Sequence, residues 1–193
     1  NQANNVNLSG DVTAATSLTL SNVNTAVQLA ANVDLTANNG ALTASSGVTA
    51  INLSGPDGST NIIDGNGSAL VSLANLTDTN NPNLTISSED NLILAGASLG
   101  SGTLNITTHD LNVTGAVSLT GAMLVTESNG DGIGLGGTSI AGGLNLTGAE
   151  LQFITAAGLT LTTSSNVVVD GITEPNSNNI TGTNSSDWIS GTD

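Results

Sequence analysis

The chain has 193 residues, with 15 Asp or Glu and no Lys or Arg, so its formal charge is −15 at neutral pH. Without permanent cations to neutralise phosphates, nucleic-acid and nucleotide binding are not expected, and without cysteine there is no disulfide, thiolate nucleophile or zinc-finger site. No apolar run approaches the roughly 20 residues of a membrane-spanning helix, so membrane insertion is not expected either. The chain starts without Met or a basic, apolar leader, which predicts a processed chain or a fragment.

The apolar residues follow a short period-2 pattern along the chain, in which two apolar residues flank one outward residue. Each unit predicts a strand of three to five residues with two inward side chains. In chain order the predicted strands centre on Asn7, Thr19, Gln28, Asp34, Asn52, Thr85, Ile93, Asn105, Asn112, Ser118, Asn145, Gln152, Thr160 and Val168. No stretch carries the i, i+3, i+4, i+7 stripe of a helix, so the chain is predicted to be all-β.

The spacing of these strands indicates which all-β fold is formed. Between residues 104 and 124 the strands begin six or seven residues apart, and the connections are too short and regular for a series of hairpins. Leu104, Leu124 and Leu144 stand at equal intervals, and each begins a similar strand. Three short strands in every interval of about 20 residues predict the coil of a parallel β-helix, in which equivalent residues stack. At that period the chain holds about nine or ten coils and forms a rod about 45 Å long, although the repeat is imperfect before residue 100.

The predicted β-solenoid domain covers residues 1–177, and residues 178–193 form a polar tail or a last coil. Within the domain, the Gly-, Pro- and Asp-rich segment 54–69 predicts a loop or an expanded coil. Aromatic residues are only 1% of the chain, so the core must be built from Leu, Val and Ile. Asn, Thr, Ser and Gly make up just over half of the residues, which suits tight corners whose backbone groups need side-chain partners.

Residues 128–172 contain the strings SNGDGIGLGGTS, GGLNLTGAELQFITAAGLTL and NVVVDGIT. They resemble the repeats of filamentous-haemagglutinin-like exoproteins, and an L-x-L-T-G pattern extends the resemblance loosely over most of the chain. The resemblance implies a right-handed parallel β-helix in a large secreted adhesin, and it implies no catalytic residues.

The last residues, 178–193, are similar to the start of a haemolysin-type calcium-repeat array, with matching positions that include Asp187 and Asp193. The resemblance implies an all-oxygen Ca²⁺ site, although Ser185 and Ser186 stand where such an array has glycines. A second oxygen-rich turn contains Asp131, and a third segment contains Asp57, Asp64 and Asn66. Each is a candidate calcium site or a turn that needs no metal; otherwise no cofactor is expected.

A catalytic function is not predicted from these residues. His109 beside Asp110 is half of a hydrolase triad at most, and no G-x-S-x-G elbow accompanies it. Parallel β-helices include polysaccharide lyases and hydrolases, but such enzymes need cations or a metal to neutralise acidic sugars, together with an acid/base pair. The carboxylates of this chain are scattered, and the only adjacent pair, Glu89 and Asp90, falls in an expected turn.

The expected function is therefore that of a secreted, non-catalytic structural or adhesive protein at the cell surface or in a matrix. Residues 1–12 and 165–193 show no capping element, so we expect the ends to meet neighbouring coils of a longer chain or other copies, head to tail. Surface glycans are a further candidate ligand. Two alternatives stay open: a solenoid that orders water or ice on rows of outward Thr, and a surface-layer lattice protein.

Overall fold

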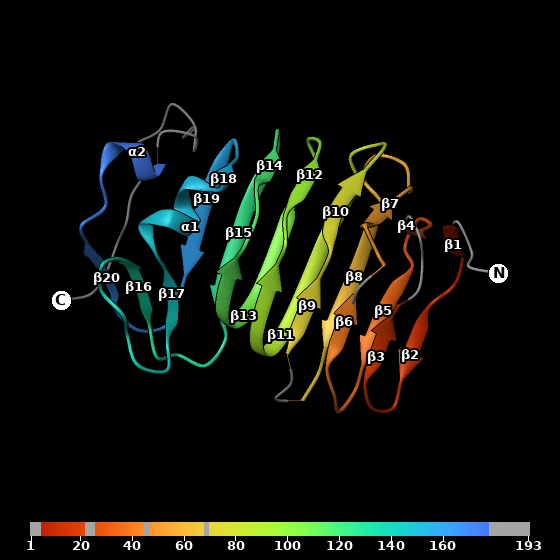
Figure 1. The fold of residues 1–193 in the computed structure, drawn as a ribbon, viewed down its shortest axis with the longest axis horizontal. Helices are drawn as coiled ribbons and strands as arrows, with labels where there is room; N and C mark the ends of the chain where they lie inside the picture. The colour runs from red at the N-terminus through yellow and green to blue at the C-terminus, as the bar shows by residue number, and fades with distance from the viewer. Residues whose placement is uncertain (1–4, 22–25, 45–46, 68–69, 178–193) are drawn as a thin grey trace.

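The computed structural model describes residues 5–21, 26–44, 47–67 and 70–177. Within this part the chain forms twenty strands and two short helices, and every strand pairing is parallel. In Figure 1 the strands lie side by side along the long axis, and the colour advances from red at one end to blue at the other. The expected all-β class with parallel strands is confirmed.

The first sheet, sheet A, has seven strands in the order β1-β4-β7-β10-β12-β14-β18. These strands are β1 (Asn5–Leu8), β4 (Ala26–Leu29), β7 (Ala50–Leu53), β10 (Asn75–Asp78), β12 (Ala97–Leu99), β14 (Val117–Leu119) and β18 (Ile154–Thr155).

The second sheet, sheet B, bends around the core and forms two faces. Its first face has the order β2-β5-β8-β11-β13-β15-β19, and its second face joins β3, β6 and β9 to the second half of β11. These strands are β2 (Val12–Ala14), β3 (Leu18–Leu20), β5 (Asp34–Ala37), β6 (Leu42–Ala44), β8 (Thr60–Gly65), β9 (Val71–Leu73), β11 (Asn83–Leu94), β13 (Leu104–Val113), β15 (Ala122–Glu127) and β19 (Gly158–Thr162). The long strands β11 and β13 cross the corner between the faces, where the buried Thr108 hydroxyl contacts the carbonyls of Asp90 and Asp110.

The third sheet, sheet C, lies at the blue end of Figure 1 and has the order β17-β16-β20. Its strands are β16 (Ile133–Gly136), β17 (Leu144–Leu146) and β20 (Val167–Asp170). Two helices, α1 (Gly148–Gln152) and α2 (Glu174–Ser177), pack against each other at this end, where the Asn176 side-chain amide donates to the Gly148 carbonyl at 3.1 Å. The sequence pattern indicated neither helix.

The repeat is less regular than the constant period predicted from sequence. Ala97 pairs with Val117 in the next layer of sheet A, but the step from Ala26 to its partner Ala50 is longer. The longest step of this sheet runs from Val117 to Ile154. Longer steps mean fewer layers, so sheet A has seven strands along its length rather than the nine or ten that the constant period predicts.

The predicted equivalence of Leu104, Leu124 and Leu144 is wrong. Leu104 pairs with Met123, so Leu124 falls on the outward side of β15 and is 36% exposed. Leu144 pairs with Ile133 in sheet C instead of stacking on β15. Because strand side chains alternate, a register change of one residue exchanges the inward and outward positions.

The longest step contains an insertion, residues 137–153, that carries β17 and α1. The strand predicted around Gln152 is wrong, because Thr147 and Glu150 form a capping box that starts α1. Glu150 also accepts a hydrogen bond from the Val113 backbone N–H at 3.2 Å, and the Asp110 carboxylate accepts one from the Asn145 N–H at 2.8 Å. The insertion is thereby anchored to the second half of β13 by two carboxylates.

One continuous aliphatic core runs through the layers, as the composition predicted. Inward Leu, Val and Ile residues such as Leu35, Leu84 and Leu104 are fully buried, and Met123 is the one methionine among them. The only aromatic side chain in the described residues, Phe153, is 42% exposed. The core therefore needs no aromatic rings, since the inward ladders of branched side chains fill it.

Asn and Asp side chains connect consecutive layers at the corners. The side chains of Asp11, Asn32, Asp78, Asn81 and Asn83 each accept a hydrogen bond from a backbone N–H about one layer further along the chain, at 2.9–3.2 Å. Each such bond contributes about 0.5–1.5 kcal/mol and satisfies an N–H that no strand pairs. This repeated use explains the abundance of Asn at corners.

Candidate functional site

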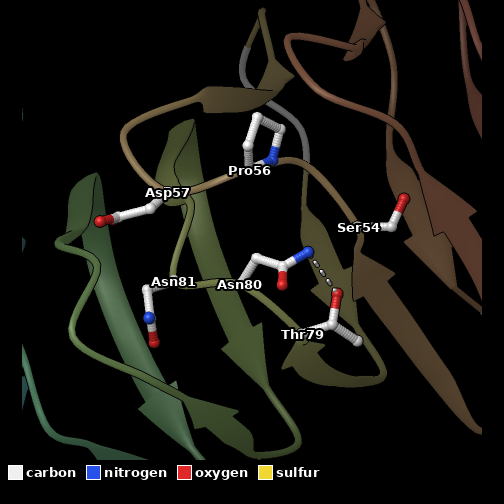
Figure 2. Close-up of a pocket in the computed structure, with 6 residues that line it drawn as sticks. All are labelled: Ser54, Pro56, Asp57, Thr79, Asn80 and Asn81. Carbon is white, nitrogen blue, oxygen red and sulfur yellow. Dashed lines mark hydrogen bonds between the residues drawn. The ribbon is translucent and has the colours of Figure 1, made fainter.

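A pocket of about 510 Å³ opens at the corner between sheet A and sheet B. It is lined by Ser54, Pro56, Asp57, Thr79, Asn80 and Asn81. Figure 2 shows Asp57 and Asn81 on one side of the pocket, Ser54 on the other, and Asn80 between them. The segments that form it follow two neighbouring strands, because residues 54–59 come after β7 and residues 79–82 come after β10.

The pocket exists because one layer is longer than its neighbours. The step from Asp34 in β5 to its partner Ile62 in β8 spans more of the chain than the step from Leu84 in β11 to Leu104 in β13. The connection 54–59 has six residues, and the connection 79–82 that follows β10 has four. Segment 54–69, which the sequence marks as irregular, thus contains this connection and strand β8 (Thr60–Gly65).

The longer connection is held in a defined conformation. Pro56 and Ser59 close a turn through a backbone bond of 3.1 Å, with Gly58 at φ +78 in the position that requires a positive angle. The Ser59 hydroxyl also donates to the Pro56 carbonyl at 2.6 Å. In the connection that follows β10, Asn81 has φ +56, and its side-chain oxygen accepts from the Ser101 N–H. These bonds fix the backbone of both connections that line the pocket.

A second polar site lies at the corner between β15 and β16. The Glu127 carboxylate is only 4% exposed, and it accepts hydrogen bonds from the backbone N–H groups of Asn129 and Gly130 and from the Thr163 hydroxyl, at 2.8–2.9 Å. Burial alone would raise the pKa of Glu127, but these hydrogen bonds outweigh it and hold the pKa below its ordinary value. A carboxylate enclosed in this way fixes the turn 128–131, which joins two faces of the fold.

The residues singled out from sequence as ligands or catalytic groups are placed as follows. The Asp131 carboxylate accepts from the Asn129 side chain at 2.9 Å, and Asp187 and Asp193 lie outside the described residues. Asp57 lines the pocket, whereas Asp64 points outward from the middle of sheet B. Across residues 5–21, 26–44, 47–67 and 70–177, no three His, Asp or Glu side chains gather into a group that can hold a metal.

His109 and Asp110, the pair considered for catalysis, face different partners. The Nδ1 atom of His109 lies 3.9 Å from the Asp90 carboxylate, and its Nε2 atom contacts the Gly142 carbonyl. Asp110 instead accepts from the backbone N–H groups of Leu111 and Asn145. His109 therefore joins β13 to the insertion, while the Asp110 carboxylate accepts hydrogen bonds from backbone N–H groups.

The outward rows of the sheets differ in the kinds of side chains that they present. The central outward row of sheet A contains only amides and hydroxyls, which in order are Asn7, Gln28, Asn52, Thr77, Ser98, Ser118 and Thr155. One outward row of sheet B contains Thr or Ser at six of seven positions, which in order are Thr13, Thr36, Asp64, Ser87, Thr107, Thr126 and Thr162. The adjacent row of sheet B includes the half-exposed Ile62 and Leu124.

Among the described residues, no helix has the length and apolar character needed to cross a membrane. Comparison of the chain with protein-family models, with curated proteins and with solved structures finds no match. The geometry of the chain itself is therefore the basis on which its function is proposed.

Proposed function

We propose that the chain is a right-handed parallel β-helix that serves as a non-catalytic structural or adhesive element outside the cell, either as a segment of a long adhesin or as the subunit of a filament. Parallel in-register pairing through consecutive layers supports the β-helix, because each layer supplies the template for the next. A continuous aliphatic core and corners held by side-chain bonds suit a rigid rod.

The observation that carries the proposal is the state of the two end layers. At the N-terminal end, Val6, Leu8 and Val12 are only partly buried, although their partners in the next layer, such as Val27 and Leu35, are fully buried. At the other end, the inward residues Leu159, Leu161 and Val167 are likewise only partly buried. The aliphatic core thus reaches the N-terminal end and the β19 and β20 faces of the other end, where another layer would complete its burial, whereas Ile154 of β18 is already fully buried beside α1.

The strands of the end layers also present an edge that no described strand covers. β1, β2 and β3 each pair with a strand on one side, and so do β18, β19 and β20 at the far end. Parallel strand edges are templates for further pairing. Stacking of β19 on β2 and of β20 on β3 of the next copy, or of the next segment of a longer chain, continues two of the faces without closing a ring, while α1 and α2 lie beyond β18 (Figure 1).

Electron microscopy and fibre diffraction of the purified chain test this proposal. We expect thin, unbranched fibres with an axial repeat of about 4.8 Å. A calcium chelator is added in a parallel sample, so that fibres lost on chelation indicate that a cation assists assembly. Val12→Asp, which places a charge at the free end, should reduce fibre formation, whereas Thr107→Asp on the middle of sheet B should not. Monomeric rods at every concentration would contradict the proposal that the chain is the subunit of a filament. The proposal that it is a segment of a longer rod would then remain.

A second candidate function rests on the Thr and Ser row of sheet B. Its hydroxyls repeat at the strand spacing of about 4.8 Å on one face, which is the geometry of a surface that orders water. Asp64 interrupts the row. Thermal hysteresis of the dilute chain near freezing, lost in a Thr107→Asp variant, would favour this function; growth of ice crystals without hysteresis would reject it.

A further inference from the structure

We propose that the pocket lined by Ser54, Pro56, Asp57, Thr79, Asn80 and Asn81 is a binding site for a neutral sugar residue, such as a terminal or internal hexose of a glycan. The site belongs to a single copy of the chain, so it operates whether or not the chain assembles into fibres. Two independent features lead to it: the expanded layer around β8 that builds the pocket, and the chemistry of the groups that line it.

Like the insertion 137–153, the connection after β7 lengthens one layer of the fold. In repeat proteins, insertions into one layer map to loops on one face, and that face is often the binding face. The connection after β7 (54–59) is longer by two residues than the connection after β10 (79–82), and it stands over that shorter connection (Figure 2). The inward positions Leu53 and Ile63 on either side of it are fully buried.

The lining groups match a compound with several adjacent hydroxyls. The Asp57 carboxylate accepts no hydrogen bond from the described residues, so both of its oxygens can accept from sugar hydroxyls. The Asn81 side chain uses its oxygen for the Ser101 N–H and keeps its NH₂ group as a donor. Asn80 donates to the Thr79 hydroxyl at the long distance of 3.4 Å and keeps its carbonyl oxygen as an acceptor. Pro56 adds an apolar ring against which the carbon face of a sugar can lie.

The same inventory argues against other ligand classes. The chain has no Lys or Arg, and the pocket contains a carboxylate, so phosphates, sulfates and uronic acids would be repelled. No aromatic side chain lines the pocket, so a flat nucleobase has nothing on which to stack. Asp57 is the only acidic residue in the lining, and one carboxylate is a poor basis for a calcium site with six to eight oxygen ligands.

The size and openness of the pocket set the expected affinity. The pocket is a shallow and largely open depression of about 510 Å³, so a sugar ring would lie against its surface and stay partly exposed to solvent. Asp57, Asn80 and Thr79 are exposed, so solvent competes for their hydrogen bonds. For one sugar residue we therefore expect a Kd on the order of 1–10 mM. Tighter binding would come from repetition of the site along a fibre.

Amide NMR titration of the ¹⁵N-labelled chain tests the proposal. The probes are methyl β-glucoside, methyl α-mannoside, methyl β-galactoside and cellobiose, with glucuronate as the charged analogue and CaCl₂ as a separate arm. We expect at least one neutral sugar to cause saturable shifts confined to the amides of residues 54–59 and 79–82, and glucuronate to cause smaller ones. Asp57→Ala and Asn80→Ala should each weaken binding about 5- to 10-fold, equivalent to the loss of one or two hydrogen bonds.

The matched control is Thr107→Ala on the outer face of sheet B, which should bind the sugar as the unchanged chain does. Neither Asp57→Ala nor Asn80→Ala should lower the melting temperature by more than about 2 °C, because neither side chain carries a structural bond shorter than 3.4 Å. The proposal is overturned if no neutral sugar causes saturable shifts up to about 100 mM, or if binding persists in the Asp57→Ala/Asn80→Ala double variant. It is also overturned if CaCl₂ alone saturates the same amides. The double variant should still form fibres, since neither residue lies at an end of the fold. A loss of sugar binding in this variant therefore tests the pocket and not the filament.

Discussion

Glu127→Gln is the substitution that most directly tests how buried carboxylates hold this fold together. Glu127 is nearly fully buried and accepts from two backbone N–H groups and the Thr163 hydroxyl at 2.8–2.9 Å. Gln keeps one acceptor oxygen but places an NH₂ group where the second oxygen received the Gly130 N–H and the Thr163 hydroxyl. Charged hydrogen bonds contribute about 1.5–3 kcal/mol each, so the loss of one and the weakening of another predict about 2 kcal/mol of destabilisation at neutral pH.

The pH dependence gives this prediction a second, independent reading. Since the pKa of Glu127 lies below its ordinary value of 4.5 in the folded chain, the ionised carboxylate stabilises the fold fully above that ordinary value. The stabilisation is lost as the pH falls through the lowered pKa of the folded state. The free-energy difference between the unchanged chain and the Gln variant should therefore be constant from pH 7 to about pH 5 and should shrink below about pH 4.5.

Urea unfolding followed by circular dichroism at pH 7, 5, 4 and 3 measures both effects. All other carboxylates titrate in both chains, so the difference isolates Glu127. Asp57→Asn is the control, because Asp57 is exposed and should change stability by less than about 0.5 kcal/mol. Equal stability of the Gln variant and the unchanged chain at pH 7, or a difference that stays constant down to pH 3, would refute the role assigned to Glu127.

The core, the insertion and the net charge give three further predictions. Leu84→Ala, in the fully buried middle, should cost about 2–5 kcal/mol, and Leu159→Ala, in the partly buried end layer, clearly less; equal losses in urea unfolding would contradict an open end. Glu150→Ala removes the capping box of α1 and the bond to Val113, so hydrogen exchange of residues 144–152 should accelerate about 5- to 30-fold with little change elsewhere. Raising NaCl from about 10 to 500 mM should raise the melting temperature, because salt screens the repulsion within a chain of charge −15; no change would mean that this repulsion is negligible.

The individual strands could be predicted from sequence because their signal is local. The units around Gln28, Asn52 and Asn105 show the inward and outward alternation that the period-2 pattern predicts. The register between strands could not be predicted in this way, because it depends on the length of every turn in between. One turn residue fewer is enough to pair Leu104 with Met123 and to expose Leu124.

The helix α1 was missed although the sequence carries its signal. Thr147 and Glu150 stand at the spacing of a capping box, but the apolar residues that follow at 151 and 153 also fit a strand. In the structure the box prevails, and Glu150 gains an additional partner in the Val113 N–H. That partner lies far back along the chain, in β13, so no local pattern indicates it.

The candidate sites, too, could be predicted from sequence only in part. The irregular composition of 54–69 indicated that something interrupts the repeat, but not that the connection 54–59 and residues 79–81 together line an open pocket. The sequence indicated Asp131 because of its oxygen-rich turn, but it did not indicate the nearby Glu127, whose carboxylate is buried. A single acidic residue at the end of a strand has no sequence signature of burial.

The amino-acid sequence by itself determined that this protein is all-β, that its core is aliphatic and that these 193 residues contain no Lys, Arg or Cys, because alternation, composition and charge belong to each residue and its nearest neighbours. The tertiary structure decided which strands stack, where the insertion 137–153 enters the fold, which carboxylates are enclosed and where a pocket opens. Those features depend on contacts between residues in different layers, such as Leu84 with Leu104 and Val117 with Ile154, which form only after all the intervening turns have taken their lengths and directions.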